Sequence, residues 1–259
     1  MNILERIATF KKREVALREQ AMPLDKLELL PLYSRSGNSL KGSLGSTPDG
    51  IIAEHKRRSP SKESINFNLD LSKVVSGYQK AGAAGISVLT DTPYFGGSLN
   101  DLLEARSVTE LPLLRKDFTI DPYQIHEAKA FGADCILLIA AILSDRQLQD
   151  YTSLAQDLGM EVLLEVHDRQ ELKRSLKTAA DIIGVNNRNL KTFEVSLTHS
   201  AQLAKEIPSS RFKISESGIY TMEDVGYLKE HGFQGFLIGE RFMREDDPGA
   251  ALNNFIDLL

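Results

Sequence analysis

FGADCILLIAA, residues 131–141, places a continuous apolar run shortly after a glycine. A run that is apolar throughout, and not at alternate positions, indicates a strand buried on both faces, as in a parallel sheet. The glycine before it is a natural stop for a helix. The same order recurs in AGAAGISV, residues 81–88, and in HGFQGFLIG, residues 231–239. The repeated unit is therefore a helix followed by a parallel strand.

Eight such runs occur in residues 50–259, separated by segments long enough for helices, such as SLNDLLEARSVTE and DRQLQDYTSLAQDLG. An open, doubly wound sheet of the dinucleotide-binding type would need a GxGxxG turn after its first strand, and the sequence has none there. We therefore predict an α/β protein with a (β/α)8 TIM barrel. The runs are GIIAEHK (50–56), GISVLTD (85–91), LPLLRKDF (111–118), CILLIAA (135–141), EVLLEVH (161–167), DIIGVNN (181–187), FKISES (212–217) and GFLIGE (235–240).

The residues before the first run predict a helical extension. Apolar residues recur at mostly helical spacing through residues 2–20, which indicates an amphipathic helix. A second short helix is expected after Pro23, in LDKLELL. Residues 34–50, rich in Ser and Gly, read as an irregular connection. We divide the chain into an N-terminal helical extension and connection, residues 1–49, and a barrel catalytic domain, residues 50–259.

Composition excludes several classes of function. The formal net charge of -5 argues mildly against nucleic acid or an anionic membrane as the main partner. The single cysteine, Cys135, lies in an apolar run and is expected to be a small buried hydrophobe in a protein of a reducing compartment. The sequence contains neither a CxxC nor an HExxH pattern, so nothing in it suggests a metal site. The start, MNILERIATFKK, lacks the apolar core of a signal peptide, so we expect a cytoplasmic protein.

Ionisable and polar residues gather at the ends of the predicted strands, where the active site of such a barrel lies. Because side chains alternate between the two faces of a strand, Glu54 and Lys56 point the same way, with Ile52 beneath them. By the same alternation Lys116 faces the barrel and Arg115 turns away. The other strand ends supply Asp91, Glu165, Asn186, Arg188 and Ser217.

A solvated strand end explains any one of these charges taken singly. Several charges at the same depth on one side of an apolar barrel are different, because a buried charge without a partner is costly. Lys56, Lys116, Glu54 and Glu165 converging on one mouth indicate a site for an anion and for acid–base chemistry.

The last two predicted strands carry a second signal. SESGI (215–219) and LIGERFM (237–243) place Gly218 and Gly239 where their backbone N–H groups are exposed. A short helix is expected to begin near Glu240 or Arg241. Strands seven and eight are the usual phosphate site of such barrels. Glycine also serves any tight turn, but its occurrence after both strands favours phosphate.

Together these segments resemble the indole-3-glycerol-phosphate synthase family. The resemblance covers the barrel from its first to its last strand, and its most specific element is ExKxxSPS, which begins at Glu54. The matching segments are IIAEHKRRSPSK, GAAGISVLTDTPYFGGSLNDL, LPLLRKDFTIDPYQIHEAKAFGADCILLI, LLEVHD, IIGVNNRNL, ISESGI and GFLIGERFM.

The resemblance implies closure of 1-(2-carboxyphenylamino)-1-deoxy-D-ribulose 5-phosphate to indole-3-glycerol phosphate, with loss of CO₂ and water, in tryptophan biosynthesis. It implies a carboxy-lyase with a phosphorylated small-molecule substrate and with neither cofactor nor metal. We expect a monomer that binds no nucleic acid and no membrane.

The resemblance also assigns roles to residues. Lys116 is the general acid on the ribulose carbonyl, and Lys56 contacts the substrate carboxylate and is a candidate donor to the departing hydroxyl. Glu165 and Glu54 share general-base and electrostatic roles. The remaining candidates are Asn186 and Ser217 as catalytic groups and, as substrate-binding residues, Ser59, Phe95, Phe118, Leu137, Arg188, Leu190, Glu216, Gly218, Leu237, Gly239 and Glu240.

Two alternatives stay open. One is a class I aldolase barrel, in which a strand-end lysine forms a Schiff base. The other is a catalytically inactive barrel that binds phosphosugars or a protein partner, which the presence of both lysines and both glutamates disfavours. For Lys116 we expect the second lysine and an apolar wall to disfavour the ammonium form, and the opposing glutamates to temper this effect.

Overall fold

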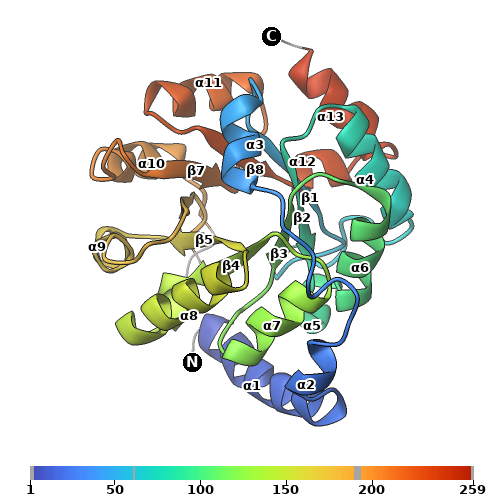
Figure 1. Ribbon diagram of the computed structural model, residues 1–259. Helices are drawn as coiled ribbons and strands as arrows, with labels where there is room; N and C mark the ends of the chain where they lie inside the picture. The colour runs from blue at the N-terminus through green and yellow to red at the C-terminus, as the bar shows by residue number, and fades with distance from the viewer. Residues whose placement is uncertain (1–2, 61, 190–193, 258–259) are drawn as a thin grey trace.

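The structure, a computed structural model, describes residues 3–60, 62–189 and 194–257. Its centre is a closed barrel of eight parallel strands in sequence order, with helices around the outside (Figure 1). Every run predicted to be a strand forms one, which confirms the (β/α)8 barrel. The strands are β1 (Ile51–His55), β2 (Gly85–Leu89), β3 (Leu113–Lys116), β4 (Cys135–Ile139), β5 (Glu161–Val166), β6 (Ile182–Asn186), β7 (Phe212–Glu216) and β8 (Gly235–Ile238).

The helices between the strands lie where the sequence leaves room for them. The two separating segments quoted above contain α6 (Leu99–Val108) and α8 (Asp145–Asp157). At the start of α8, Ser144 and Gln147 form a capping box that satisfies backbone N–H groups of the first turn. The others are α4 (Leu71–Lys80), α5 (Thr92–Phe95), α7 (Pro122–Ala130), the 3₁₀ helix η1 (Ala140–Ile142), α9 (Arg169–Ser175), α10 (Leu197–Ala204), α11 (Met222–Glu230), α12 (Glu240–Met243) and α13 (Pro248–Ile256).

Three glycines end the helices that precede strands, as predicted. Gly132 follows α7 with a φ of 86°, a left-handed conformation that a side chain would strain, and a Cβ there would lie 2.7 Å from the side chain of Arg106. Gly82 and Gly232 have the same conformation after α4 and α11. These glycines turn the chain from each helix into the next strand.

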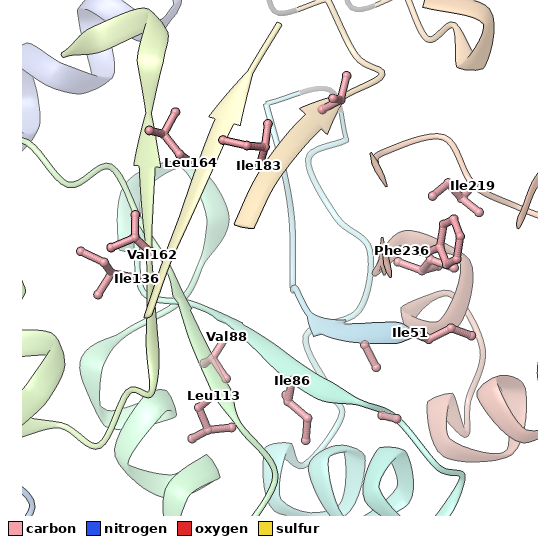
Figure 2. Close-up of a cluster of buried hydrophobic side chains, with 14 of the residues drawn as sticks. Ile51, Ile86, Val88, Leu113, Ile136, Val162, Leu164, Ile183, Ile219 and Phe236 are labelled. Carbon is pink, nitrogen blue, oxygen red and sulfur yellow. The ribbon is translucent and has the colours of Figure 1, made fainter. Parts of the chain in front are cut away.

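Alternate strand residues divide between two apolar cores. The outer core lies between the strands and the surrounding helices and contains Ile51, Val88 and Ile136 (Figure 2). The inner core fills the barrel and contains the residues of opposite parity, among them Ile52 and Cys135, both fully buried. The barrel is therefore closed by packed side chains, and only the ends of its strands are available for chemistry.

The N-terminal extension contains one helix more than predicted. The expected helices are present as α1 (Ile3–Ala21) and α2 (Leu24–Leu27). The segment 34–50 is not irregular throughout, because it contains α3 (Leu40–Ser46), capped by Ser39. Two leucines four residues apart lie on one face of this helix. The Ser- and Gly-rich composition of the segment hides this pattern. Leu40 and Leu44 are buried in the inner core and pack against Gly85 and Gly235, the first residues of β2 and β8.

α3 thus covers the N-terminal end of the barrel. α1 reaches the inner core through Ile7. No helix within the described residues combines the length and the apolar character that crossing a bilayer requires.

Candidate active site

A pocket opens at the C-terminal ends of the strands, and all eight strands contribute to its lining. Every residue to which the resemblance assigns a site role lines this pocket except Leu190, which lies outside the described residues. Asp91, expected at the same mouth, does not line the pocket and is buried beside Lys11. The residues brought together are Glu54, Lys56, Ser59, Phe95, Lys116, Phe118, Leu137, Glu165, Asn186, Arg188, Glu216, Ser217, Gly218, Leu237, Gly239 and Glu240.

Lys116, the last residue of β3, lies between two carboxylates. Its Nζ donates to Oε2 of Glu165 at 3.0 Å and to Oε2 of Glu216 at 2.6 Å. Burial alone would lower the pKa of Lys116, but Glu165, Glu216 and Glu54 outweigh it, so the pKa is raised. The expectation that its ammonium form is disfavoured was therefore wrong. The carboxylates hold Lys116 as a charged proton donor.

The two carboxylates beside Lys116 differ in protonation. Burial, reinforced by the charge of Glu165, raises the pKa of Glu216 to about 7, although Lys116 lowers it. Oε1 of Glu216 is buried and has no hydrogen-bond partner among the described residues. Burial also raises the pKa of Glu165, but Lys116 and then His167 lower it by more, so this carboxyl stays ionised. Glu216 is closer to Lys116 than Glu165 is, so proximity to the lysine does not explain the difference. The difference agrees with the position of His167, which contacts Glu165 and not Glu216.

His167 was not predicted as a site residue. It follows β5 directly, and its Nε2 lies 3.2 Å from Oε1 of Glu165. The alternation of faces along β5 carries the signal, because a residue two positions after Glu165 points to the same side.

Glu54 and Lys56 form the second charged pair of the mouth. Nζ of Lys56 donates to Oε2 of Glu54 at 2.6 Å, and Oγ of Ser87, on the neighbouring strand β2, lies 3.4 Å from Oε1. Glu54 is buried, whereas Lys56 is partly exposed toward the pocket. The charged end of β1 is therefore an ion pair at the mouth of the barrel.

Two glycines inside the barrel make room for these carboxylates. A Cβ at Gly239 would lie 2.5 Å from Oε2 of Glu54. A Cβ at Gly184, in the middle of β6, would lie 2.4 Å from Oε1 of Glu216. Both distances are too short for non-bonded atoms, so any larger residue would displace the acid. Gly184 was not predicted, because a glycine inside a strand gives no sign of which side chain faces it.

The chain leaves β7 through two consecutive left-handed residues. Ser217 has a φ of 70° and Gly218 a φ of 69°. A non-glycine residue in this conformation is strained by about 1–3 kcal/mol and persists only when its surroundings fix it. Here Nδ2 of Asn187 donates to the carbonyl of Ser217 at 2.7 Å and to Oγ of Ser215 at 2.9 Å. Asn187 does not line the pocket, and it supports Ser217 through these hydrogen bonds.

The rim of the pocket continues after β8, the neighbour of β7. α12 begins at Glu240, where a short helix was expected. The carboxylate of Glu240 forms ion pairs with Arg244 and, at 3.6 Å, with Lys62.

Arg188 follows β6, and its backbone N–H donates to Oδ1 of Asn186 at 2.9 Å.

An apolar wall faces the charged groups. The rings of Phe95 and Phe118 lie 6.0 Å apart, centroid to centroid, and Leu137 continues the wall. Sequence reasoning missed a contribution from the extension: Ile3, Leu4 and Ile7 of α1 also line the pocket. The helical spacing of these residues predicted a buried face but not what it covers. Within the described residues, no three or more His, Cys, Asp and Glu side chains are grouped as a metal site.

Known proteins resemble the chain at two levels. Structures of thiamine phosphate pyrophosphorylase from Pyrococcus furiosus and of N-acetylmannosamine-6-phosphate 2-epimerase from Clostridium perfringens each superpose with a TM-score of 0.62. They are 14% and 17% identical in sequence, over 85% and 87% of this chain and 97% and 98% of theirs. At such identities the likeness shows the fold alone.

Sequence comparison goes further. Indole-3-glycerol phosphate synthase from Bacteroides thetaiotaomicron is 44% identical over 255 residues, 98% of each chain. The protein of the same name from Laribacter hongkongensis is 46% identical over 256 residues, 97% of each chain. A family model described as indole-3-glycerol phosphate synthase matches residues 4–255. The chain therefore belongs to the indole-3-glycerol phosphate synthase family.

Proposed function

We propose that acid–base catalysis at this mouth closes 1-(2-carboxyphenylamino)-1-deoxy-D-ribulose 5-phosphate to indole-3-glycerol phosphate, with loss of CO₂ and water. The observation that carries the proposal is the position of Lys116, a charged donor between Glu165 and Glu216 and opposite an apolar wall. The reaction is the carboxy-lyase step of tryptophan biosynthesis that gives the family its name.

The first step is ring closure. The aromatic carbon that carries the carboxylate attacks the ketone carbon of the ribulose, and negative charge develops on the ketone oxygen. Lys116 donates a proton to this oxygen as the bond forms, which is typically worth about 10²- to 10⁴-fold in rate. Phe118 and Leu137 hold the aromatic ring and exclude water from it.

The later steps need a second donor and a base. Loss of CO₂ from the attacking carbon restores the aromatic ring and leaves a hydroxyl on the newly bonded carbon. That hydroxyl departs as water when Lys56 protonates it, while a carboxylate removes a proton from the neighbouring carbon. Glu165 is the ionised acid nearest Lys116 and acts as this base, with Glu54 stabilising Lys56.

The substrate phosphate occupies the end of the pocket formed after β7 and β8. Backbone N–H groups of Gly218 and Gly239 are the donors, and Ser59 adds a hydroxyl from the loop after β1. Each charge-assisted hydrogen bond is worth about 1.5–3 kcal/mol. The side chain of Glu240 is engaged with Lys62 and Arg244, so only its backbone N–H is offered to the phosphate.

The aldolase alternative is disfavoured by the state of Lys116. A Schiff-base lysine must be a neutral amine to attack a carbonyl carbon. Lys116 is instead kept as an ammonium by Glu165 and Glu216. The inactive alternative is disfavoured because the carboxylates around Lys116 are buried, at a cost that mere binding does not require.

The test is to mix the protein with the carboxyphenylamino substrate and follow the fluorescence of the indole product. Wild-type protein should form product, and Lys116→Met should lose it while retaining a cooperative unfolding transition. Lys80→Met, at an exposed lysine of α4, is the matched control and should keep full activity. Absence of product with the wild type, or normal turnover in Lys116→Met, would reject the proposal.

We also propose that the chain acts as a monomer in the cytoplasm. Its single cysteine, Cys135, is a buried free thiol, which suits a reducing compartment. Light scattering in the presence of substrate measures the oligomeric state directly.

A further inference from the structure

Each of the two carboxylate oxygens of Glu165 contacts a different basic side chain, Lys116 or His167. Oε2 of Glu165 accepts from Lys116 at 3.0 Å, and Oε1 lies 3.2 Å from Nε2 of His167. Glu165 is the predicted base, and its side chain is almost fully buried. His167 does not line the pocket, so any influence it has on the reaction passes through Glu165.

The imidazole of His167 is fixed on its other side as well. Nδ1 lies 3.2 Å from Oε2 of Glu171, in the first turn of α9, and the same oxygen accepts the backbone N–H of His167 at 2.8 Å. The carbonyl of His167 meets Nε2 of His199, on α10, at 2.7 Å. Both ring nitrogens thus lie within 3.2 Å of carboxylate oxygens, although Nε2 is at ion-pair distance from Glu165 without hydrogen-bond geometry. Two carboxylates this close favour the charged imidazolium.

We propose that His167, held as an imidazolium between Glu165 and Glu171, is a positioning residue that keeps Glu165 ionised with Oε2 turned toward Lys116. The exchangeable proton of the cluster then resides on Glu216. This inference rests on the proposed roles of Lys116 and Glu165, and it adds a division of labour that the sequence left open.

The charges around the cluster support this division. Burial lowers the pKa of His167, but Glu165 and Glu171 raise it to about 10. The groups that face the cluster come from several elements. They are Glu54 on β1, Lys116 on β3, Glu171 on α9, His199 on α10 and Glu216 on β7. With Lys56, which pairs with Glu54, the three cations His167, Lys116 and Lys56 match the three carboxylates Glu165, Glu171 and Glu54 when Glu216 carries a proton.

Removing His167 takes one positive charge from the cluster, which should then bind a proton more tightly. An opposite charge within about 4–6 Å moves a pKa by 1–3 units. The acidic limb of the pH profile of kcat/KM, which reports the coupled pair Glu165 and Glu216, should move upward by about one pH unit in His167→Asn. His199→Asn removes a neighbouring histidine without touching the carboxylates, and its acidic limb should stay in place.

A second measurement is independent of catalysis. In protein labelled with ¹³C and ¹⁵N at histidine, the His167 signals, identified by their absence in His167→Asn, should show an imidazolium from pH 6 to pH 8. In Glu171→Gln the same ring should titrate at lower pH, because one of its two carboxylates is gone. If His167→Asn fails to fold, Glu171→Gln still tests the charge of His167.

Three outcomes would overturn the inference: a His167 ring that is neutral at pH 7, an unchanged titration in Glu171→Gln, or an unchanged acidic limb in a folded His167→Asn protein. The failure of the proposed function looks different. In that case the wild type makes no indole at any pH, while the resonances of His167 still titrate and still report on its charge.

Discussion

Nζ of Lys11 lies 3.0 Å from Oδ1 of Asp117, and both side chains are completely buried. The same Nζ lies 2.9 Å from Oδ2 of Asp91, which follows β2. Asp117 comes directly after Lys116 and is also paired with Arg115 at 3.1 Å. A lysine of the first helix is therefore ion-paired with residues that follow two strands beside the site. It fixes α1 where its apolar residues complete the wall of the pocket.

We predict that Lys11→Met destabilises the protein by about 3–5 kcal/mol, because it leaves two buried carboxylates with one cation fewer. A loosened α1 would also raise KM for the aromatic substrate. Urea unfolding measures the first effect and steady-state kinetics the second. Lys12→Met, at the exposed neighbouring lysine, should change stability by less than about 0.5 kcal/mol. Equal stability of the two variants would show that the buried pairs contribute nothing.

We predict that Gly184→Ala impairs catalysis more than folding. The new Cβ would push the carboxylate of Glu216 away from Lys116, and it would also meet Cδ1 of Leu163 at 3.0 Å. Overpacking of this kind costs about 1–3 kcal/mol of stability, whereas a displacement of about 1 Å at a reacting group can cost 10²-fold in rate. Product fluorescence measures the loss of rate, and urea unfolding measures the loss of stability.

The matched control is Gly226→Ala on α11, where a Cβ meets nothing within 4 Å. It should keep full activity and gain up to about 1 kcal/mol of stability, because alanine favours a helix. A fully active Gly184→Ala protein would mean that Glu216 tolerates displacement and is not needed at its observed position.

The sequence was sufficient for the barrel and for most of the pocket, because both follow from local periodicity. Continuous apolar runs gave the strands, and alternation along each strand placed Glu54 and Lys116 at the mouth. What it could not supply depends on contacts between distant segments. Lys11 reads as a solvated charge of an amphipathic helix, although its place midway between the buried residues Ile7 and Val15 is a signal that it shares their face.

The protonation states were the least predictable feature. The charge of Lys116 depends on which of several carboxylates touch it, and the sequence placed Glu216 only as a substrate-binding residue. The distances decide the sign of the pKa shift, since two carboxylates within 3.0 Å outweigh the effect of burial. His167 likewise acts through one contact that no motif encodes.

We predict that Glu216→Gln is much less active than the wild type, and that its stability relative to the wild type increases as the pH rises. Folding raises the pKa of Glu216 from 4.5 to about 7, so the folded protein favours the protonated acid. This contribution is fully present below about pH 4.5 and is lost as the pH rises through about 7. Glutamine is neutral throughout, so relative to wild type the variant should gain on the order of 1–3 kcal/mol between pH 4.5 and pH 8.

Urea unfolding of both proteins at pH 5 and at pH 8 gives this difference directly. Glu63→Gln, at an exposed residue of the loop after β1, should show no such dependence on pH. If the stability advantage of Glu216→Gln is the same at both values, Glu216 is not the group that holds the proton.

We predict that no covalent bond forms between the enzyme and its substrate during turnover. A Schiff base requires a neutral lysine whose nitrogen approaches the carbonyl carbon. Lys116 is held as an ammonium by Glu165 and Glu216, and it donates to the carbonyl oxygen. The carbonyl carbon must remain open, because the aromatic carbon of the substrate attacks it. Borohydride added during turnover should therefore leave a chain of unmodified mass in intact mass spectrometry. A reduced adduct that maps to Lys116 or Lys56 would replace the acid–base mechanism with that of an aldolase.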